Sequence, residues 1–287
     1  MSKENRYQEY DTWAWLYNQT MGPEYSKQQL QPIETLLLPK LPQKATILDL
    51  CCGTGHLVQH LTEKGYHVTG IDGSEAMLAY ASLNAPEAKF ILDDARTFEL
   101  PYKVDAVCST SASLNHIMSL EELKQVFGQV YLALKENGLF LFDLNHPSQM
   151  AKWWKGGIAE GEIETEYAWA IASDYNAKDT TGYFKVIYYR APSQPVTVLG
   201  YLRQLLYKLL SLRVLTRFRL KLLARFPQWE KKWHSKEMTY YVKGYANADV
   251  RSALEAVGFI DVDLLTLEGS TNVDDNHSAY FICRKER

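Results

Sequence analysis

Apolar and polar positions alternate along the chain in a way that predicts strands and helices in turn. Short apolar runs of the length of buried strands lie at 46–50, 66–72, 88–92, 104–110, 139–143, 259–267 and 278–284. Segments whose apolar residues recur every three or four positions predict helices at 26–42, 56–65, from 74 onward, 119–135 and 247–257. Ser119 and Asn247 are expected to cap the helices that they begin, and Asn137-Gly138 is expected to break the helix before it. Pro227 is expected to end a further helix. Strands that alternate with helices in this way are typical of an α/β sheet.

The turn after the first predicted strand contains two closely spaced glycines, Gly53 and Gly55. Glycine lets the backbone turn sharply and lie against a ligand, because it has no Cβ. A dinucleotide fingerprint, G-x-G-x-x-G, needs a third glycine where Val58 stands, so no pyrophosphate cradle is indicated. The pattern predicts a nucleotide-binding strand–turn–helix unit, with an ordinary turn of another α/β protein as the alternative.

A carboxylate closes the second predicted strand. Asp72 follows Asp49 of the first strand by 23 residues. At this place a nucleotide-binding fold holds a carboxylate that accepts both ribose hydroxyls. The sequence therefore predicts that Asp72 binds a ribose.

The bulk composition limits the class of protein. The 287 residues are 46% apolar and 23% charged, which is ordinary for a globular protein with a sizeable core. The polar start of the chain predicts no secretory signal, and no apolar run reaches the length of a membrane span. The four cysteines have no C-x-x-C spacing and no metal cluster is visible, so we expect buried free thiols in a reducing cytosol.

Three motifs resemble those of the class I S-adenosylmethionine (SAM) methyltransferases. Residues 49–55 resemble the first motif, D-x-x-x-G-T-G, although Cys51 replaces the first glycine of the usual G-x-G-x-G. Residues 70–78 resemble the second motif, G-x-D-x-S-x-x-M-L, and 93–96 resemble a G-D-A-R segment. This resemblance implies an α/β fold with a Rossmann-like seven-stranded sheet, mostly parallel with an antiparallel last strand. It also implies SAM as the cofactor and S-adenosylhomocysteine as its product.

The resemblance implies roles for particular residues. Asp94 would accept the adenine N6 proton, and Tyr17, in a segment similar to the A-x-x-Y-D opening of small-molecule methyltransferases, would face the sulfonium. The residues expected to bind the cofactor are Asp49, Cys51, Gly53, Gly55, Asp72, Gly73, Met77, Asp94, Ala95, Ser109 and Tyr17. Those expected to bind the acceptor are Tyr25, His116, Asn145, His146 and Trp169.

His116 is the candidate general base. It follows the fourth predicted strand, in a loop that resembles S-S-x-x-H-L of sugar N-methyltransferases. Ligands of open α/β sheets lie at the carboxyl ends of the strands, and histidine titrates near neutrality. We therefore predict that His116 takes the acceptor's proton and that Tyr17 assists at the sulfonium. A histidine bonded to backbone is the alternative.

About 100 residues are inserted before the last helix. Gly156-Gly157 predicts a flexible entry to this insertion, and residues 229–245 are expected to return to the core. The alternating segments 164–173 and 181–190 predict two antiparallel strands that cap the acceptor pocket. Residues 200–226 carry seven basic residues and no acidic one, and Arg213, Arg217, Lys221 and Arg225 are spaced as a helical stripe. Docking on an anionic membrane or a hydrophobic partner, a lid over the substrate and self-association all stay open. Nucleic-acid binding is disfavoured, because the stripe is rich in leucine.

These predictions combine into one domain plan. Residues 1–29 form an N-terminal helical lid, 30–147 and 245–287 form the SAM-binding core, and 148–244 form an inserted cap. The predicted function is cytoplasmic methyl transfer from SAM to N or O of a small-molecule acceptor. A lipid-like or quinone acceptor at a membrane surface is one alternative. A SAM-binding scaffold without turnover is another, and a nucleotide oxidoreductase is a distant one.

Overall fold

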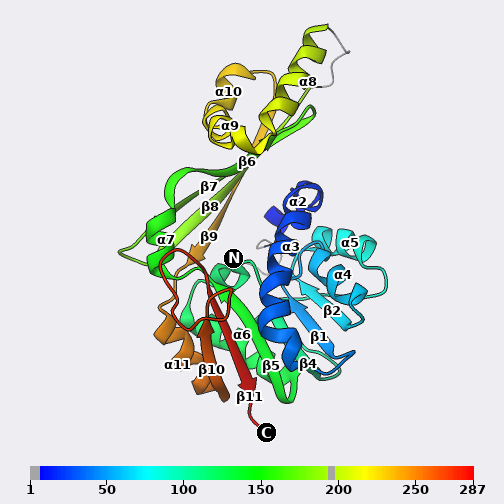
Figure 1. Ribbon diagram of the computed structural model, residues 1–287, viewed down its shortest axis with the longest axis vertical. Helices are drawn as coiled ribbons and strands as arrows, with labels where there is room; N and C mark the ends of the chain where they lie inside the picture. The colour runs from blue at the N-terminus through cyan, green and yellow to red at the C-terminus, as the bar shows by residue number, and fades with distance from the viewer. Residues whose placement is uncertain (1–6, 193–197) are drawn as a thin grey trace. The chain divides into compact units, whose positions relative to one another are not determined.

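The computed structural model describes residues 7–192 and 198–287, which divide into two compact units (Figure 1). The first unit comprises Met1–Gln149 and Lys243–Arg287, and the second comprises Met150–Val242. Whether the N-terminal helices act as a lid and the second unit as a cap stays a prediction.

A seven-stranded sheet in the order β10-β11-β5-β4-β1-β2-β3 forms the first unit. β11 runs antiparallel to both β10 and β5, and the pairs among β1 to β5 are parallel. The predicted mostly parallel sheet with an antiparallel last strand is confirmed. Its strands are β1 (Thr46–Leu50), β2 (His67–Asp72), β3 (Lys89–Leu92), β4 (Val104–Ser109), β5 (Leu134–Leu144), β10 (Phe259–Leu265) and β11 (Ala279–Lys285).

Successive side chains of the central strands enter two separate cores, because a strand points alternate residues to opposite faces. Phe140 and Phe142 of β5 pack in one core with α6 and α11, and Leu141 packs in the other with α4 and α5. The strands are buried on both faces, which explains their nearly continuous apolar runs. The helices of this unit are α1 (Gln8–Asp11), α2 (Ala14–Gln19), α3 (Met21–Pro32), α4 (His56–Glu63), α5 (Glu75–Asn84), α6 (Leu120–Ala133) and α11 (Asn247–Val257).

Some helix boundaries differ from the predictions. The helix expected at 26–42 begins at Met21 as α3 and continues as a π-helical turn (Ile33–Leu37) and a 3₁₀ turn (Leu38–Lys40). Asn247 was expected to cap α11, but Ala246 precedes the helix and provides no side-chain cap. The predicted cap of α6 is present, since Ser119 Oγ accepts a hydrogen bond from the N–H of Glu122.

The pair Asn137-Gly138 forms part of β5 and does not separate it from α6. β5 begins at Leu134, and its pairing with β4 shifts register between Val104 and Ala106. Asn137 has a φ of 59°, a left-handed conformation that asparagine tolerates better than most residues. The turn signal therefore marks a bulge inside a strand.

The second unit contains a four-stranded sheet in the order β6-β7-β8-β9 together with several helices. The predicted antiparallel pair is present as β7 and β8, joined by a short polar turn. The segment around Gly156, expected as a flexible entry, is strand β6, and β9 completes this sheet and not the core of the first unit. The strands are β6 (Lys155–Ile163), β7 (Tyr167–Asn176), β8 (Thr181–Arg190) and β9 (His234–Lys243). α7 (Pro147–Trp153) leads into them.

The basic segment at 200–226 forms two helices, α8 (Val198–Leu210) and α9 (Thr216–Leu223), and leads into α10 (Phe226–Trp229). Figure 1 shows them together at one end of the four-stranded sheet. The single helical stripe expected here is broken, because Arg213 lies in a 3₁₀ turn and Arg225 precedes α10. Pro227 was expected to end a helix and instead stands in the first turn of α10, where its missing N–H costs nothing.

The expected buried thiols are present: all four cysteines are free, and three of them are buried. In the described parts of the chain, no helix is both long enough and apolar enough to span a bilayer.

Candidate functional site

The turn from β1 to α4 has an unusual backbone. Cys51, Gly53 and Gly55 have positive φ values of 66°, 53° and 73°. Glycine adopts this region freely, whereas other residues resist it, so two of the three positions favour glycine. A Cβ on Gly55 would lie 2.8 Å from the Cβ of Ala81 in α5. The turn therefore packs closely against α5, with no room for a side chain at Gly55.

Two carboxyl groups, the buried one of Asp49 and the half-buried one of Asp72, lie on the neighbouring strands β1 and β2. Asp72 accepts hydrogen bonds from the N–H groups of Gly53, at 2.8 Å, and Ser74, at 2.9 Å. Burial raises the pKa of Asp72, and these backbone donors oppose that shift. Burial and then the charge of Asp72 raise the pKa of Asp49 to about 8. Asp72 is therefore the better placed of the two to remain an ionised acceptor.

Asp94, two residues beyond β3, lies in an ion pair. Its Oδ1 accepts from the backbone N–H of Arg96 at 2.9 Å and from Nε of Arg96 at 2.8 Å. Burial alone would raise the pKa of Asp94, but the hydrogen bonds from Arg96 and Tyr7 lower it to about 2. Asp94 is thus ionised, and its predicted contact with adenine would share the carboxylate with these two partners.

Ser109, the last residue of β4, is fully buried beside the thiol of Cys51. Its hydroxyl makes no hydrogen bond to an N or O atom among the described residues, and its polar neighbour is the Cys51 thiol. A buried hydroxyl without a full hydrogen bond costs about 1–3 kcal/mol. Contact of Ser109 with the cofactor stays a prediction. Met77 and Ala95, also predicted to bind the cofactor, are buried at the start of α5 and just after β3.

The N-terminal helices place aromatic rings against the glycine turn. The ring of Tyr17, in α2, comes within 3.6 Å of the point where a Cβ on Gly53 would lie. Burial, followed by the charges of Asp72 and Asp49, raises the pKa of Tyr17. Tyr25 of α3 packs edge to face on Tyr17, with ring centroids 6.3 Å apart. The structure therefore brings both tyrosines to the predicted cofactor residues, and their functional roles stay predictions.

Two residues that the sequence did not single out also reach this edge. The ring of Tyr7 covers Gly73, where a Cβ would lie 2.4 Å from it. Asp11 accepts hydrogen bonds from Ser74 Oγ at 2.6 Å and from the N–H of Ala76 at 3.2 Å, at the start of α5. More than 60 residues separate Asp11 from these partners, so no local pattern signals the contact.

His116 ends a 3₁₀ turn (Ser113–His116) that follows β4. The hydroxyl of Tyr10 lies 3.1 Å from its Nε2 and 3.4 Å from its Nδ1, and the two rings meet edge to face. The hydroxyl therefore lies at the edge of the imidazole between its two nitrogens, and the role of His116 as a general base stays a prediction. No sequence motif signalled the contact with Tyr10.

The loop that carries His116 is held from several sides. Ser111 and Ala112 adopt positive φ values of 60° and 53°, a strained conformation for residues with a Cβ. The N–H of Ala112 donates to Asp143 Oδ2 at 3.0 Å. The side chain of Asn115 donates to the carbonyl oxygens of Asn145, at 2.9 Å, and Lys243, at 2.7 Å. The loop is therefore preorganised at the end of β4.

Three residues predicted to bind the acceptor are hydrogen-bonded or buried within the protein: Asn145, His146 and Trp169. Asn145 Oδ1 accepts from Ser278 Oγ at 3.0 Å. His146 is buried, and its Nε2 lies 3.1 Å and 3.2 Å from the carbonyl oxygens of Asp274 and His277. Trp169 belongs to the second unit and is buried in β7. Contact of these residues with an acceptor stays a prediction.

Comparison with known proteins gives the family. A methyltransferase domain model matches residues 47–138. The chain is 32% identical over 165 residues to the putative methyltransferase YqeM of Bacillus subtilis, covering 56% of this chain and 65% of that protein. It is 36% identical over 155 residues to an uncharacterized methyltransferase of Synechocystis, covering 53% of this chain and 69% of the relative.

A third relative is a sugar-modifying enzyme. It is the dTDP-3-amino-3,4,6-trideoxy-alpha-D-glucopyranose N,N-dimethyltransferase of Streptomyces venezuelae, 28% identical over 133 residues, covering 46% of this chain and 52% of that enzyme. The chain thus spans about half to two thirds of the length of these curated relatives.

Solved structures agree on the fold. An S-adenosylmethionine-dependent methyltransferase from Clostridium acetobutylicum superimposes with a TM-score of 0.70 at 17% identity, covering 97% of this chain and 99% of that one. The sugar N-methyltransferase KedS8 from Streptoalloteichus gives a TM-score of 0.64 at 17% identity, covering 93% and 88%. The fold and motifs together define a class of protein: the chain belongs to the class I SAM-dependent methyltransferases.

The residues at the carboxyl edge fit SAM as the cofactor. The glycine turn is compact, Asp72 retains acceptor capacity for a ribose, and the buried hydroxyl of Ser109 makes no hydrogen bond to an N or O atom among the described residues. Among the described residues, no group of three or more His, Cys, Asp or Glu side chains is placed to hold a metal ion.

Proposed function

We propose that this chain transfers a methyl group from SAM to a nitrogen or oxygen of a small-molecule acceptor, with an amino sugar nucleotide as the first candidate. The observation that carries the proposal is the convergence of Asp72, Asp94, Ser109 and the His116 loop at the ends of successive parallel strands. The sugar-modifying relatives support the choice of acceptor.

SAM, when bound, supplies an electrophilic methyl group on its sulfonium. The chain has to hold the reactants, exclude water and accept a proton. Asp72 and the turn at Gly53 hold the donor end, and Tyr17 packs over that turn. The imidazole of His116, beside the hydroxyl of Tyr10, takes the proton that the acceptor loses when its nitrogen or oxygen is methylated.

A lipid-like acceptor reached at a membrane surface is the second candidate. The specific observation in its favour is the cluster of exposed leucines and basic residues on α8 and α9. A SAM-binding protein without turnover is the third hypothesis, because the residues that bind the donor do not by themselves require a reaction.

Transfer of a labelled methyl group from SAM tests the proposal. The purified chain is incubated with methyl-labelled SAM and, in parallel, with amino sugar nucleotides, quinones and phospholipid vesicles. Label in the sugar nucleotide, reduced ~10²-fold by His116→Ala, is the expected result. Label only in the lipid or quinone fraction supports the second candidate. SAM binding without label in any acceptor contradicts the sugar assignment.

A further inference from the structure

The second unit exposes an apolar helix face. On α8, five large apolar side chains each expose between 47% and 57% of their surface: Tyr201, Leu202, Leu205, Leu206 and Leu209. Positions 202, 205, 206 and 209 recur every three or four residues, so they lie on one side of the helix. An α-helix of a globular protein normally turns such a side toward the core.

The orientation of α8 is fixed by its opposite face. Tyr207 and Leu210 are buried in a cluster with Phe226 and with Tyr189 of β8. The hydroxyl of Tyr207 donates to the buried carboxylate of Glu230 at 2.5 Å, and Arg203 pairs with the same carboxylate at 3.2 Å. Because these anchors hold the inner face, the leucines of the outer face cannot turn inward.

The apolar surface continues beyond α8. Val214, in the following 3₁₀ turn, is 85% exposed, and Phe218 of α9 is 55% exposed. The chain between α8 and α9 adds Leu212, also half exposed. We call these side chains, with the five of α8, the leucine face.

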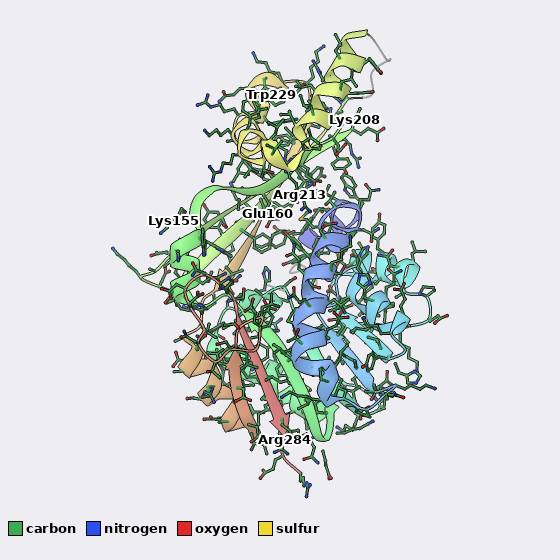
Figure 2. The ribbon with its side chains drawn as sticks, in the orientation of Figure 1. Lys155, Glu160, Lys208, Arg213, Trp229 and Arg284 are labelled. Atoms are coloured by element: carbon green, nitrogen blue, oxygen red, sulfur yellow. The ribbon has the colours of Figure 1, made fainter. Side chains whose placement is uncertain are left out.

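Basic residues accompany the leucine face. Those exposed on or next to it are Lys208, Arg213, Arg217, Lys221 and Arg225. Figure 2 marks Lys208 and Arg213 on this helical end of the second unit. Within the part of the chain that the structure describes, these five side chains form no ion pair. The net charge of residues 200–226 is +7, and that of the rest of the chain is −10.

The positive charge beside the leucine face distinguishes between two candidate partners for that face, a second copy of the chain and an anionic bilayer. A second copy of the chain packed symmetrically on the leucine face would bring the same basic residues against one another. An anionic bilayer offers apolar chains to the leucines and phosphate groups to the arginines and lysines. From exposure and charge together, we infer that α8 and α9 dock the protein on the surface of an anionic phospholipid bilayer.

The docking is interfacial. α8 has 13 residues, a length of about 20 Å along its axis, and it is followed at once by a bend. Its leucines enter the boundary between headgroups and acyl chains while Lys208 and Arg213 stay among the phosphates. The inference concerns this surface alone and holds whichever acceptor the chain methylates.

Vesicle flotation with the full chain tests the inference. The protein is expected to float with vesicles of phosphatidylcholine and phosphatidylglycerol at low salt, and to float far less with phosphatidylcholine alone. Raising the salt concentration lowers binding, because exposed charges are screened. Leu205→Gln/Leu209→Gln is expected to lower the vesicle partition coefficient roughly tenfold or more, since two apolar side chains no longer leave water.

The charge is tested separately. Arg213→Gln/Arg217→Gln is expected to lower binding to anionic vesicles roughly 25-fold, about fivefold for each basic residue, and to leave weak binding to neutral vesicles unchanged. Two matched controls use exposed residues elsewhere: Leu83→Gln/Leu132→Gln for the leucines and Lys40→Gln/Lys178→Gln for the charges. Both controls are expected to float like the parent chain.

Calorimetric binding of S-adenosylhomocysteine accompanies every variant, so that loss of the donor site is distinguished from loss of docking. Equal flotation of parent and Leu205→Gln/Leu209→Gln protein overturns the inference. So does a parent chain that ignores anionic vesicles but forms a dimer in sedimentation, with the dimer abolished by the same pair of substitutions. That result assigns the leucine face to a second copy.

Discussion

Replacing Asp72 by alanine is expected to weaken the binding of S-adenosylhomocysteine at least tenfold. Asp72 accepts one hydrogen bond each from the N–H groups of Gly53 and Ser74, at 2.8 Å and 2.9 Å. A carboxylate has about four acceptor positions, and the N–H of Gly73 is a third backbone donor to Asp72, so about one remains for a ribose hydroxyl. This is the bond that the substitution removes from the complex.

The magnitude follows from the charge of the acceptor. A hydrogen bond to a charged group contributes a net ~1.5–3 kcal/mol, and a tenfold loss of affinity corresponds to ~1.4 kcal/mol. One lost bond at the lower limit already gives the tenfold change. The substitution also leaves the N–H of Gly53 without its acceptor, so the free energy of unfolding falls by about 1–3 kcal/mol.

Isothermal titration calorimetry measures the affinity, and a thermal melt of each variant measures the stability separately. Asp263→Ala is the matched control, because Asp263 is an exposed carboxylate on β10. The control is expected to keep both affinity and melting temperature. An Asp72→Ala protein that melts as a folded chain and binds with unchanged affinity would refute the assignment of Asp72 to the ribose.

Three further predictions test other parts of the account. His116→Ala is expected to lower turnover ~10²-fold without changing the affinity for S-adenosylhomocysteine, and Tyr10→Phe is expected to lower turnover less. If His116→Ala turns over as fast as the parent chain, His116 is a packing residue. Burial raises the pKa of Asp49 to about 8, so the folded chain keeps a proton on this carboxyl group between pH ~4 and ~8. The unfolded chain has released that proton in the same range, so the free energy of unfolding falls as the pH rises from about 4 to 8. Asp49→Asn is expected to flatten that decline in thermal melts at pH 5.5 and 8, and parallel curves would contradict it. Arg219→Ala removes hydrogen bonds to the carbonyl oxygens of Gly161 and Leu210, and each lost bond is expected to lower the free energy of unfolding by about 1.5–3 kcal/mol. Denaturant unfolding measures this loss, and the exposed control Arg217→Ala is expected to change the free energy by no more than about 0.5 kcal/mol. Equal losses in the two variants would show that burial of Arg219 is unimportant.

Local patterns predicted most of the first unit. Apolar runs located the strands of the sheet, and the signal at Ser119 placed the start of α6 within one residue. Asp72 lies at the end of β2 beside the glycine turn, as its spacing from Asp49 indicated. These features succeed because each depends on residues close together in the sequence, where periodicity and capping act.

The missed contacts join distant segments. Tyr10 and His116 are 106 residues apart, and Asp11 caps α5 from a helix more than 60 residues earlier. Arg219 was counted among the seven basic residues of 200–226, yet it is buried against β6 and donates to the carbonyl oxygen of Gly161. A basic residue looks the same in sequence whether it faces water or carbonyl groups, so only the packing of α9 on the sheet decides.

A crystal structure of the chain with S-adenosylhomocysteine would show directly whether Asp72 and Asp94 bind the donor. The ribose hydroxyls are expected within hydrogen-bonding distance of the Asp72 carboxylate, and the adenine is expected beside Asp94. The backbone of the turn at Gly53 is expected against the amino-acid end of the ligand. A ligand bound away from the carboxyl edge of β1 and β2, with Asp72 untouched, would contradict the account.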